Sequence, residues 1–445
     1  MFPRRKASLQ ESSKWAFDVV ALLVACLGTQ ELQSSLFCQG SSLSTQFTGI
    51  GAVEHSVQFL VAAANKYGLH FGCHVRWGCD KDERCQEYMA SKCGGQHCMF
   101  KDILDLISDG HTMNHDSFHG LDIFLKVKLI LSLMRNSHAW CFAHKRVCPL
   151  TFTTIAIAGS PCIDHSRIGS RAGLEGRTFL LLLVWLAFHR SAHTPLLLHE
   201  NVKGFPVWIM RLIMGDMYWV YELEVDTWHV GFGLVRRPRI LIVMLHKVRI
   251  LLFHDILGIL HMVFAHLSVK KTVALDCWGA FKEEFQQEFL YLASTRKHLA
   301  HLPCEALLKL KPIDILNDRE KIVRLECLDK CAQSGCDLRG ITLHLGDSTS
   351  YNDTSGLRDG IMPTLRRGGG LMWAEGLGRW LAASELFAAM GFAVTSELAD
   401  AAHVPQYHLP GRHGKEAKAL LGNSMCVPAM GTVIAVVLAC TRQVC

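Results

Sequence analysis

Short apolar runs alternate with longer amphipathic stretches over residues 46–250, and the runs end in glycine, aspartate or asparagine. Runs of four to eight apolar residues that stop at a turn residue are typical of buried strands, and the amphipathic stretches between them are typical of helices. This alternation predicts a parallel sheet with crossover helices, an α/β fold. Three strand ends are most distinct: QFTGIG (46–51), IAIAGSPC (155–162) and LLLHENV (196–202).

The pattern changes after residue 250. Residues 251–370 lose the strand–helix rhythm and end in a basic, glycine-rich stretch, LRDGIMPTLRRGGG. Helical periodicity returns in GRWLAASELFAAMGF (378–392), and a Gly-Asn-Ser turn then opens a last apolar helix. We therefore predict four parts: an N-terminal leader (1–40), a first α/β part (41–250), an irregular inserted region (251–370) and a return to the α/β domain (371–445).

Composition narrows the class of protein. Half of the 445 residues are apolar and 19% are charged, which is typical of a folded chain with a large core. The net charge of +6 permits a polyanionic partner without requiring one. The apolar runs at 179–188 and 240–264 are too short or too interrupted by charge to span a bilayer, so we expect no membrane contact.

The 18 cysteines bear on the compartment. The N-terminal apolar run is short, carries Asp18 and follows a polar stretch, which argues against a cleaved signal peptide. Reduced thiols in the cytosol or nucleus are then expected. Two cysteine-rich stretches could hold zinc, CGGQHC (93–98) and the group of Cys327, Cys331, Cys336 and His344, but their spacings match no common zinc motif. We therefore assign no metal site and expect buried thiols.

In a parallel sheet, ligands bind beyond the carboxyl ends of the strands. FTGIG forms a glycine turn after a strand, with Phe47, Gly49 and Gly51 open to a cofactor, although G-x-G-x-x-G is not met. Asp80 and Asp102 follow the next two strands and could bind a ribose hydroxyl and an adenine amino group. This order predicts an adenosine-containing cofactor. The alternative is that each acid is an ordinary helix cap, which has more weight for Asp102 than for Asp80 but less than cofactor binding.

Six segments follow one another along the chain: FTGIG, GSPCIDHS, HENV, RRPR, GRWLAASELFAAMGF and GNSMCVP. Their order is that of the motifs of the cytosine-5 DNA methyltransferase family. The chain resembles this family over nearly all of residues 46–440 outside 251–370. The resemblance implies a Rossmann-like class I methyltransferase domain with an inserted target recognition domain. It also implies S-adenosylmethionine as the methyl donor, with Asn423 and Ser424 of the last motif at the cofactor.

The resemblance also implies a chemistry. Carbon 5 of cytosine is a poor nucleophile, so a thiolate first adds at carbon 6, and Cys162 on its basic loop is suited to this role. Glu200 would bind ring nitrogen 3 if burial raises its pKa, and Asn201 would orient it. Arg237 and Arg239 would contact the cytosine carbonyl and the acid.

These atoms are out of reach inside a duplex, so the family flips the target base out of the helix. Ser166, Arg167 and Arg171 are candidates to hold phosphates or to fill the vacated stack. Arg366 and Arg367 of the glycine-rich stretch could enter a groove, where arginine favours guanine. The expected partner is double-stranded DNA, bound by a monomer.

The chain departs from the family at Ile163, His165, Val235 and Ala382, where glutamine, an aromatic residue, glutamine and threonine are usual. We expect catalytic competence with altered loop contacts. The alternatives are a relative acting on tRNA, whose usual Cys-Phe-Thr signature is missing from 251–370, and an inactive scaffold that binds cofactor or DNA. A DNA substrate predicts the nucleus in a eukaryote and the cytoplasm in a bacterium.

Overall fold

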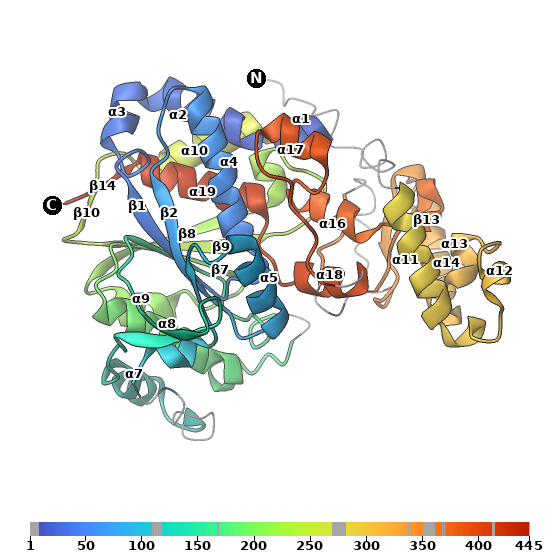
Figure 1. Cartoon of the computed structure of the whole chain (residues 1–445), viewed down its shortest axis with the longest axis horizontal. Helices are drawn as coiled ribbons and strands as arrows, with labels where there is room; N and C mark the ends of the chain where they lie inside the picture. Colours follow the sequence, from blue (N-terminus) through green and yellow to red (C-terminus); the bar gives the residue numbers. More distant parts are fainter. Residues whose placement is uncertain are drawn as a thin grey trace. The chain divides into compact units, whose positions relative to one another are not determined.

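Nine strands form the central sheet of the computed structural model, in the order β5-β4-β3-β2-β1-β6-β7-β9-β8 (Figure 1). The structure describes residues 9–108, 110, 118–166, 169–268, 282–336, 338–349, 361–366, 368, 370–411 and 414–444. The strands are β1 Ser41–Gln46, β2 Cys73–Cys79, β3 Cys98–Phe100, β4 His138–Cys141, β5 Arg146–Pro149, β6 Ile155–Ala158, β7 Leu196–Val202, β8 Tyr218–Val225 and β9 Arg239–His246.

The five strands in the order β3-β2-β1-β6-β7 run parallel. Strand β9 inserts antiparallel between β7 and β8, and the β4–β5 hairpin adds an antiparallel edge beside β3. From β1 the chain builds β2 and β3 on one side and then returns to place β6 and β7 on the other. This reversal is the switch point of a Rossmann-like sheet. The α/β class predicted from the sequence is confirmed.

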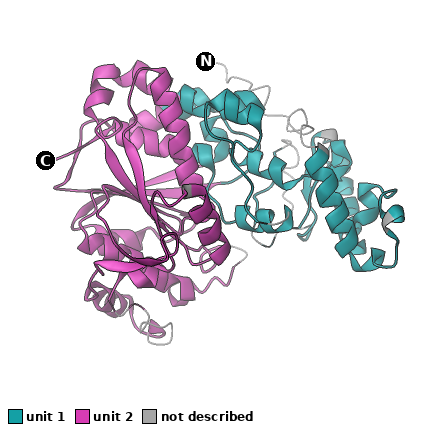
Figure 2. Cartoon of the chain, viewed as in Figure 1, with its two compact units in different colours: residues 1–18, 226–237, 263–429 teal, residues 19–225, 238–262, 430–445 magenta. Residues whose placement is uncertain are grey.

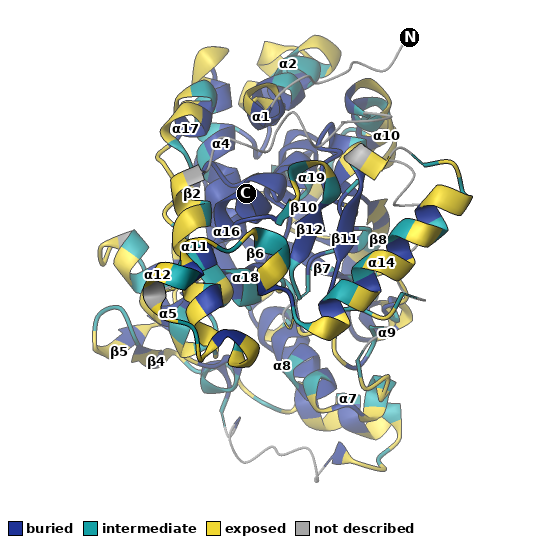
Figure 3. Cartoon of the chain, turned by 90° about the vertical axis from the view of Figure 1, so that its right-hand side faces the viewer, coloured by how far each residue is buried: buried dark blue, intermediate teal, exposed yellow. Residues whose placement is uncertain are grey.

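Helices connect and cover the strands. They include α4 (Ala52–Lys66) after β1, α5 (Glu83–Cys93) after β2 and α8 (Arg177–Ser191) between β6 and β7. The apolar run 179–188 lies in α8, where nearly every side chain is buried, as predicted for a core element. Burial is also almost complete along β6, β7 and β9 (Figure 3). No helix among the described residues is long and apolar enough to cross a membrane.

The part of the chain around the central sheet contains further helices and one further pair of strands. The helices are α2 Trp15–Leu27, α3 Thr29–Ser34, α7 Ile123–Leu131, α9 Trp208–Met214, α10 Ile256–Leu267 and α19 Val427–Ala439. Strands β10 (Ile250–Leu252) and β14 (Thr441–Gln443) form a separate antiparallel pair. The last helix is apolar throughout, as the sequence predicts for the stretch after the Gly-Asn-Ser turn.

The chain divides into two compact units, coloured separately in Figure 2. The central-sheet unit comprises residues 19–225, 238–262 and 430–445, and the second unit comprises residues 1–18, 226–237 and 263–429. The second unit contains a small antiparallel sheet of β11 (Thr342–His344), β12 (Met372–Ala374) and β13 (Arg379–Trp380). Its helices are α1 Leu9–Ser13, α11 Lys282–Thr295, α12 Cys304–Leu307, α13 Pro312–Ile315, α14 Asp318–Gln333, α16 Ala383–Ala389, α17 Ser396–Ala402 and α18 Gly414–Leu421.

This division differs from the four parts predicted from the sequence. Residues 251–262 group with the central sheet, and residues 371–429 group with the second unit rather than with the α/β domain. Residues 9–34 of the predicted leader are mostly helical. The assignment of residues 251–370 to target recognition stays a prediction.

Candidate active site

The carboxyl ends of β6 and β7 bring the two strongest sequence candidates to one edge of the sheet. The strands pair in parallel with Ala158 opposite His199, so the loop that carries Cys162 leaves the sheet beside the residues that begin with Glu200. Both segments belong to the central-sheet unit. The loop after β1, which contains the predicted cofactor turn, leaves at the same edge because β1 is also parallel to β6.

Glu200 forms an ion pair with Arg239. The Nε atom of Arg239 lies 2.9 Å from Oε1 of Glu200, and the two side chains are only 16% and 15% exposed. Strand register explains the pair, because Val202 on β7 faces Arg239 on β9 and Glu200 lies two positions along the same face. A guanidinium in this place fixes the carboxyl group and leaves its second oxygen for another contact.

Asn201 and His199 hold the start of the thiol loop. The Asn201 amide donates to the backbone carbonyl of Ser160 at 3.3 Å and to its hydroxyl at 3.2 Å. The Ser160 hydroxyl also pairs with Nε2 of His199 at 2.9 Å. Burial lowers the pKa of His199 to about 3, so this ring is neutral at physiological pH. Because Cys162 follows Ser160 by only two residues, the Cα atoms of these two residues are at most about 7.6 Å apart.

The segment after Cys162 is a turn anchored by Asp164. The amides of His165 and Ser166 donate to the Cys162 carbonyl at 3.0 and 2.8 Å. Buried Asp164 accepts from the Ser170 hydroxyl at 2.7 Å and from the backbone and hydroxyl of Thr178. Burial alone would raise the pKa of Asp164, but these hydrogen bonds outweigh it and hold the pKa below its usual value.

Asp164 also explains a glycine in the loop. A Cβ at Gly176 would lie 1.9 Å from Cγ of Asp164, so only glycine lets the backbone pass this carboxylate. Asp164 was not among the residues predicted from the sequence, because an acid in a polar loop is expected to be a solvated side chain. The signal available was the glycine and threonine that follow it in GRT (176–178).

His165 takes the place where the family usually has an aromatic residue, and its ring makes an aromatic contact. It packs edge-to-face on Phe205 with ring centroids 5.2 Å apart, and Phe205 also contacts His199. Burial lowers the pKa of His165, which favours the neutral ring. Among the predicted DNA contacts, the Ser166 hydroxyl accepts from the Gly169 amide, and Arg171 has a positive φ of 54°. Arg167 lies outside the described residues.

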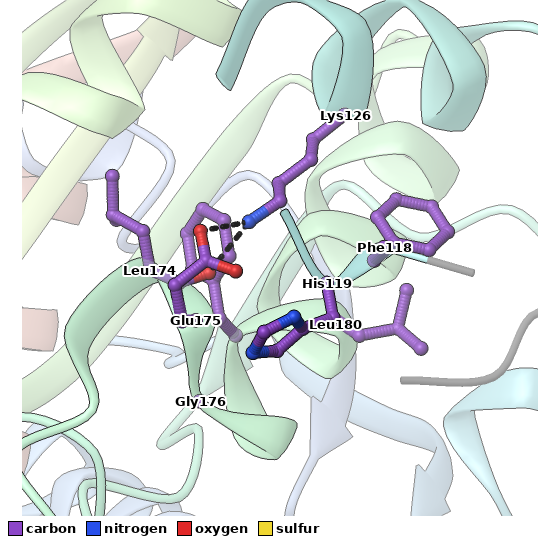
Figure 4. Close-up of a pocket in the computed structure, with 8 residues that line it drawn as sticks. Phe118, His119, Lys126, Leu174, Glu175, Gly176 and Leu180 are labelled. Carbon is purple, nitrogen blue, oxygen red and sulfur yellow. Dashed lines mark hydrogen bonds and ion pairs between the residues drawn. The ribbon is translucent and has the colours of Figure 1, made fainter. Parts of the chain in front are cut away.

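The far end of the loop is anchored in a small pocket (Figure 4). Buried Lys126 of α7 donates to Oε1 of Glu175 at 2.5 Å and to the Leu174 carbonyl at 3.1 Å. The Gly120 amide donates to the other oxygen of Glu175 at 3.1 Å. The hydrogen bond from Lys126 lowers the pKa of Glu175 and keeps it ionised. Both ends of the loop, at Ser160 and Glu175, are therefore fixed to the sheet-bearing unit.

The glycine turn after β1 is tied to the end of β2. Phe47, Gly49 and Gly51 all have positive φ, at 54°, 58° and 78°. The Gly49 amide donates to the Asp80 carboxylate at 2.7 Å, and the other oxygen of Asp80 accepts from the Asp82 amide. A Cβ at Gly49 would meet nothing within 4 Å, so the backbone there is open to approach by a ligand. Gly51 caps the N-terminus of α4.

Asp102 has the geometry of a helix cap. Its Oδ1 accepts from the Leu104 amide at 3.1 Å at the start of the short helix η1 (Ile103–Leu106), and its Oδ2 lies 3.0 Å from Nζ of Lys81. The alternative that the sequence left open for this residue therefore has structural support. Contact of Asp80 and Asp102 with a cofactor stays a prediction.

The other predicted residues lie in the second unit. Buried Arg237 donates to the carbonyls of Leu365, Gly422 and Ser424, so it fastens the turn that contains Asn423 and Ser424. Its guanidinium is thus engaged by backbone, whereas Arg239 is the arginine that contacts Glu200.

Two further arginines of the second unit are paired with acids. Arg366 binds Asp347 at 2.5 Å, and Arg367 lies outside the described residues. Arg379 binds buried Glu385 through both oxygens, at 2.8 and 2.7 Å, and Glu385 also accepts from the Ala382 amide. The acid thus caps α16 at the position where the family's usual threonine is replaced by Ala382.

Comparison with known proteins gives structural likeness only. No protein-family model and no curated protein matches the chain. The Dnmt2 methyltransferase of S. pombe matches with a TM-score of 0.44 and 14% identity over 89% of this chain and 98% of its own.

Two other solved structures match over the same shares of the two chains. A putative DNA modification methyltransferase from an E. coli prophage has a TM-score of 0.43 at 12% identity, and the Entamoeba histolytica methyltransferase EhMeth has 0.46 at 11%. The function proposed below therefore depends on the arrangement of this chain's own residues.

Proposed function

We propose that the chain is an S-adenosylmethionine-dependent cytosine-5 methyltransferase acting on double-stranded DNA. The observation that carries the proposal is the ion pair between Glu200 of β7 and Arg239 of β9, with the thiol loop tied to β7 by Asn201. A nucleophile and an oriented acid at neighbouring strand ends are what addition to a pyrimidine ring requires. A DNA substrate further predicts a nuclear protein in a eukaryote.

The cofactor residues fit an adenosine-containing methyl donor. The turn at 47–51 presents left-handed backbone and the N-terminus of α4 beside the switch point, an arrangement suited to a nucleotide-like ligand. Gly49 leaves open space above the backbone, and Asp80 holds the turn in place. S-adenosylmethionine supplies, when bound, an electrophilic methyl group on a sulfonium sulfur.

Three side chains would carry the activation of the cytosine ring. The Cys162 thiolate forms a bond to carbon 6, and the electron pair displaced from the 5,6 double bond moves into the ring. Glu200 acts in its protonated form: it gives its proton to ring nitrogen 3, which takes up the displaced electron pair, while Arg239 holds the carboxyl group in place. Carbon 5 then takes the methyl group and loses its proton to a base or water. Breaking the bond from carbon 6 to sulfur restores the double bond and releases Cys162.

The loop geometry suggests how the thiol is positioned. Asn201 and Asp164 fix the backbone on either side of Cys162, so little conformational entropy remains to be lost when the substrate arrives. The short turn from Cys162 to Ser166 leaves the sulfur on a half-buried segment instead of in the packed core. This is the property that the sequence predicts for a nucleophilic cysteine.

A mechanism-based trap tests the proposal. Duplex DNA of mixed sequence with 5-fluorocytosine on one strand is incubated with the full chain and S-adenosylmethionine, because fluorine at carbon 5 blocks elimination. We expect a covalent complex on a denaturing gel that Cys162→Ala abolishes and Cys38→Ala, a half-buried cysteine far from the loop in sequence, retains.

The same trap discriminates the alternatives. An adduct with 5-fluorocytosine RNA and none with DNA would move the substrate to RNA. Absence of any adduct, with S-adenosylmethionine binding measured by calorimetry, would favour an inactive scaffold. An adduct that persists in Cys162→Ala would overturn the assignment of the nucleophile.

A further inference from the structure

Three thiols and one imidazole meet at the β3 edge of the central sheet. Cys98 begins β3, Cys141 ends β4 and Cys148 lies in β5, while His144 lies in the turn between β4 and β5. Their sulfur atoms and one ring nitrogen lie within 4.8 Å of one another. Within the part of the chain that the structure describes, no other group of three or more histidine, cysteine or acidic side chains is gathered in this way.

The distances converge on a single atom. Nδ1 of His144 lies 3.5 Å from the sulfur of Cys98, 3.2 Å from that of Cys141 and 3.6 Å from that of Cys148. One ring nitrogen offers either one hydrogen or one lone pair, so it satisfies only one of three thiols by hydrogen bonding. Hydrogen bonding therefore does not explain why all three sulfurs surround it.

A tetrahedral metal ion does explain the arrangement. Zinc–sulfur bonds of about 2.3 Å and zinc–nitrogen bonds of about 2.0–2.1 Å at tetrahedral angles give sulfur–nitrogen edges of about 3.6 Å. The three sulfur–nitrogen distances of 3.5, 3.2 and 3.6 Å are close to this length. Three thiolates and one imidazole are a common ligand set of structural zinc, and soft sulfur ligands disfavour magnesium and calcium.

The surrounding backbone orients the imidazole for this role. Nε2 of His144 lies 3.0 Å from the carbonyl oxygen of Gly95, which can only accept, so Nε2 carries the hydrogen and Nδ1 keeps the lone pair for a metal. Gly94 and Gly95 both have positive φ, at 53° and 75°, which turns the chain after α5 toward His144. Such a carbonyl partner is a frequent companion of metal-bound histidine.

We propose that Cys98, Cys141, His144 and Cys148 bind one zinc ion in a closed structural site. The ion fastens the β4–β5 hairpin to β3, which otherwise contact through strands of only three or four residues. On binding, the three thiols release their protons to solvent, and the site then carries one net negative charge. Lys145 and Arg146 in the hairpin supply nearby positive charge.

This assignment differs from the cysteine groups that the sequence offers. CGGQHC contributes Cys98 alone, because its other ligands come from the distant CFAHKRVC segment (141–148). In the other group, Cys327 and Cys331 are buried on α14, and His344 faces Asp347 at 3.5 Å. The expectation that all of these thiols lack a metal is replaced by the present proposal for one cluster. It does not depend on the proposed function.

Metal content tests the site directly. The full chain, purified under reducing conditions from zinc-supplemented cells, is analysed by elemental mass spectrometry, and we expect about one zinc per chain. Cys148→Ser and His144→Gln lower this to less than about a tenth, because each removes a ligand. Two matched controls should keep the bound zinc. Cys336→Ser changes a cysteine of the other cysteine group, and His97→Gln changes the residue directly before Cys98.

A spectroscopic measurement keeps the test valid if the ligand variants fail to fold. Wild-type protein reconstituted with cobalt should show the strong visible bands of tetrahedral cobalt and near-ultraviolet sulfur-to-cobalt charge transfer, both reversed by added zinc. A folded wild-type chain without bound zinc, octahedral cobalt bands, a disulfide between two of these cysteines, or zinc lost in either control would overturn the proposal.

Discussion

Two cysteine-bearing regions of the central-sheet unit differ in how the thiol is held. Beside β7, Cys162 lies half-buried on a loop whose ends are fixed by Asn201 and Glu175. At the β3–β4–β5 edge, three sulfurs crowd one ring nitrogen. In the first region, hydrogen bonds hold the backbone on both sides of the cysteine, and in the second the side chains are constrained by one another.

The histidines show the same contrast. His199 is fully buried between Ser160 and the rings of Trp185 and Phe205, and burial keeps it neutral. His144 is half-buried in a hairpin turn, and its two nitrogens have separate partners. A histidine that packs in a core and a histidine that presents a lone pair cannot be told apart from composition. Their neighbours in space distinguish them.

The largest expected effects come from one cysteine substitution in each of the two regions, each of which should leave the other region unchanged. Cys162→Ser should abolish the covalent adduct with 5-fluorocytosine DNA while retaining zinc and the melting temperature, since the loop is anchored through other residues. Cys148→Ser should lose zinc and lower the melting temperature, since the hairpin loses its fastening. Adduct gels, elemental analysis and calorimetry on the same preparations measure all three quantities. Loss of zinc in Cys162→Ser would contradict the separation.

This contrast also shows what the sequence could and could not predict. The rhythm over residues 46–250 predicts the parallel core because strands such as β6 and β7 begin with short apolar runs and are followed by turn residues. The central strand β1 is buried but reads SSLSTQ, so it carries no such apolar signal. The β4–β5 hairpin gives no such signal, since its strands are short and alternate in exposure. The zinc ligands were missed for the same reason, because only the pairing of β3 with β4 brings Cys98 to the hairpin.

The candidate site divides in a similar way. Cys162 and Glu200 could be picked out as candidates because a motif resemblance marks both. Which arginine meets Glu200 could not, because Arg237 and Arg239 are two positions apart in an extended segment and only tertiary contacts separate them. The role of Asp164 could not be predicted, because its hydrogen-bond partners Ser170 and Thr178 are six and fourteen residues away in the sequence and come close to it only in the folded loop.

The next largest effect concerns the acid beside the thiol. Glu200→Gln should lower the rate of methyl transfer by about 10²–10⁴-fold, since the amide cannot supply a proton to ring nitrogen 3. Affinity for DNA should change little. Glu224→Gln is the matched control, because Glu224 lies on β8, beyond β9 in the same sheet, and belongs to an exposed ion pair with Lys203. Rates with tritiated methyl donor measure the effect, and equal losses in both variants would refute a catalytic role for Glu200.

Arg239 should act through Glu200 and have a smaller effect. Arg239→Ala removes the only ion-pair partner of Glu200 found among the described residues and should slow methyl transfer by about 10–100-fold. Arg239→Lys should restore part of the lost rate, because a lysine ammonium still offers a positive charge to the carboxyl group. Rates with tritiated methyl donor measure the effect. A rate in Arg239→Ala equal to that of the wild type would show that the arginine does not act through Glu200.

The smallest effect concerns the response of the buried, neutral His199 to acid. Folded His199 has a pKa of about 3 against 6.5 for the free side chain, so between these values the unfolded chain binds a proton that the folded chain excludes. Stability should therefore be complete above pH 6.5 and fall as the pH is lowered. His199 contributes up to about 1.4 kcal/mol per pH unit to this loss. His199→Gln should flatten the dependence of the unfolding free energy between pH 6 and about 4, measured by urea titration. Exposed His261→Gln should leave the dependence as steep as in the wild type, and the same slope in both variants would mean that His199 is not a neutral core histidine.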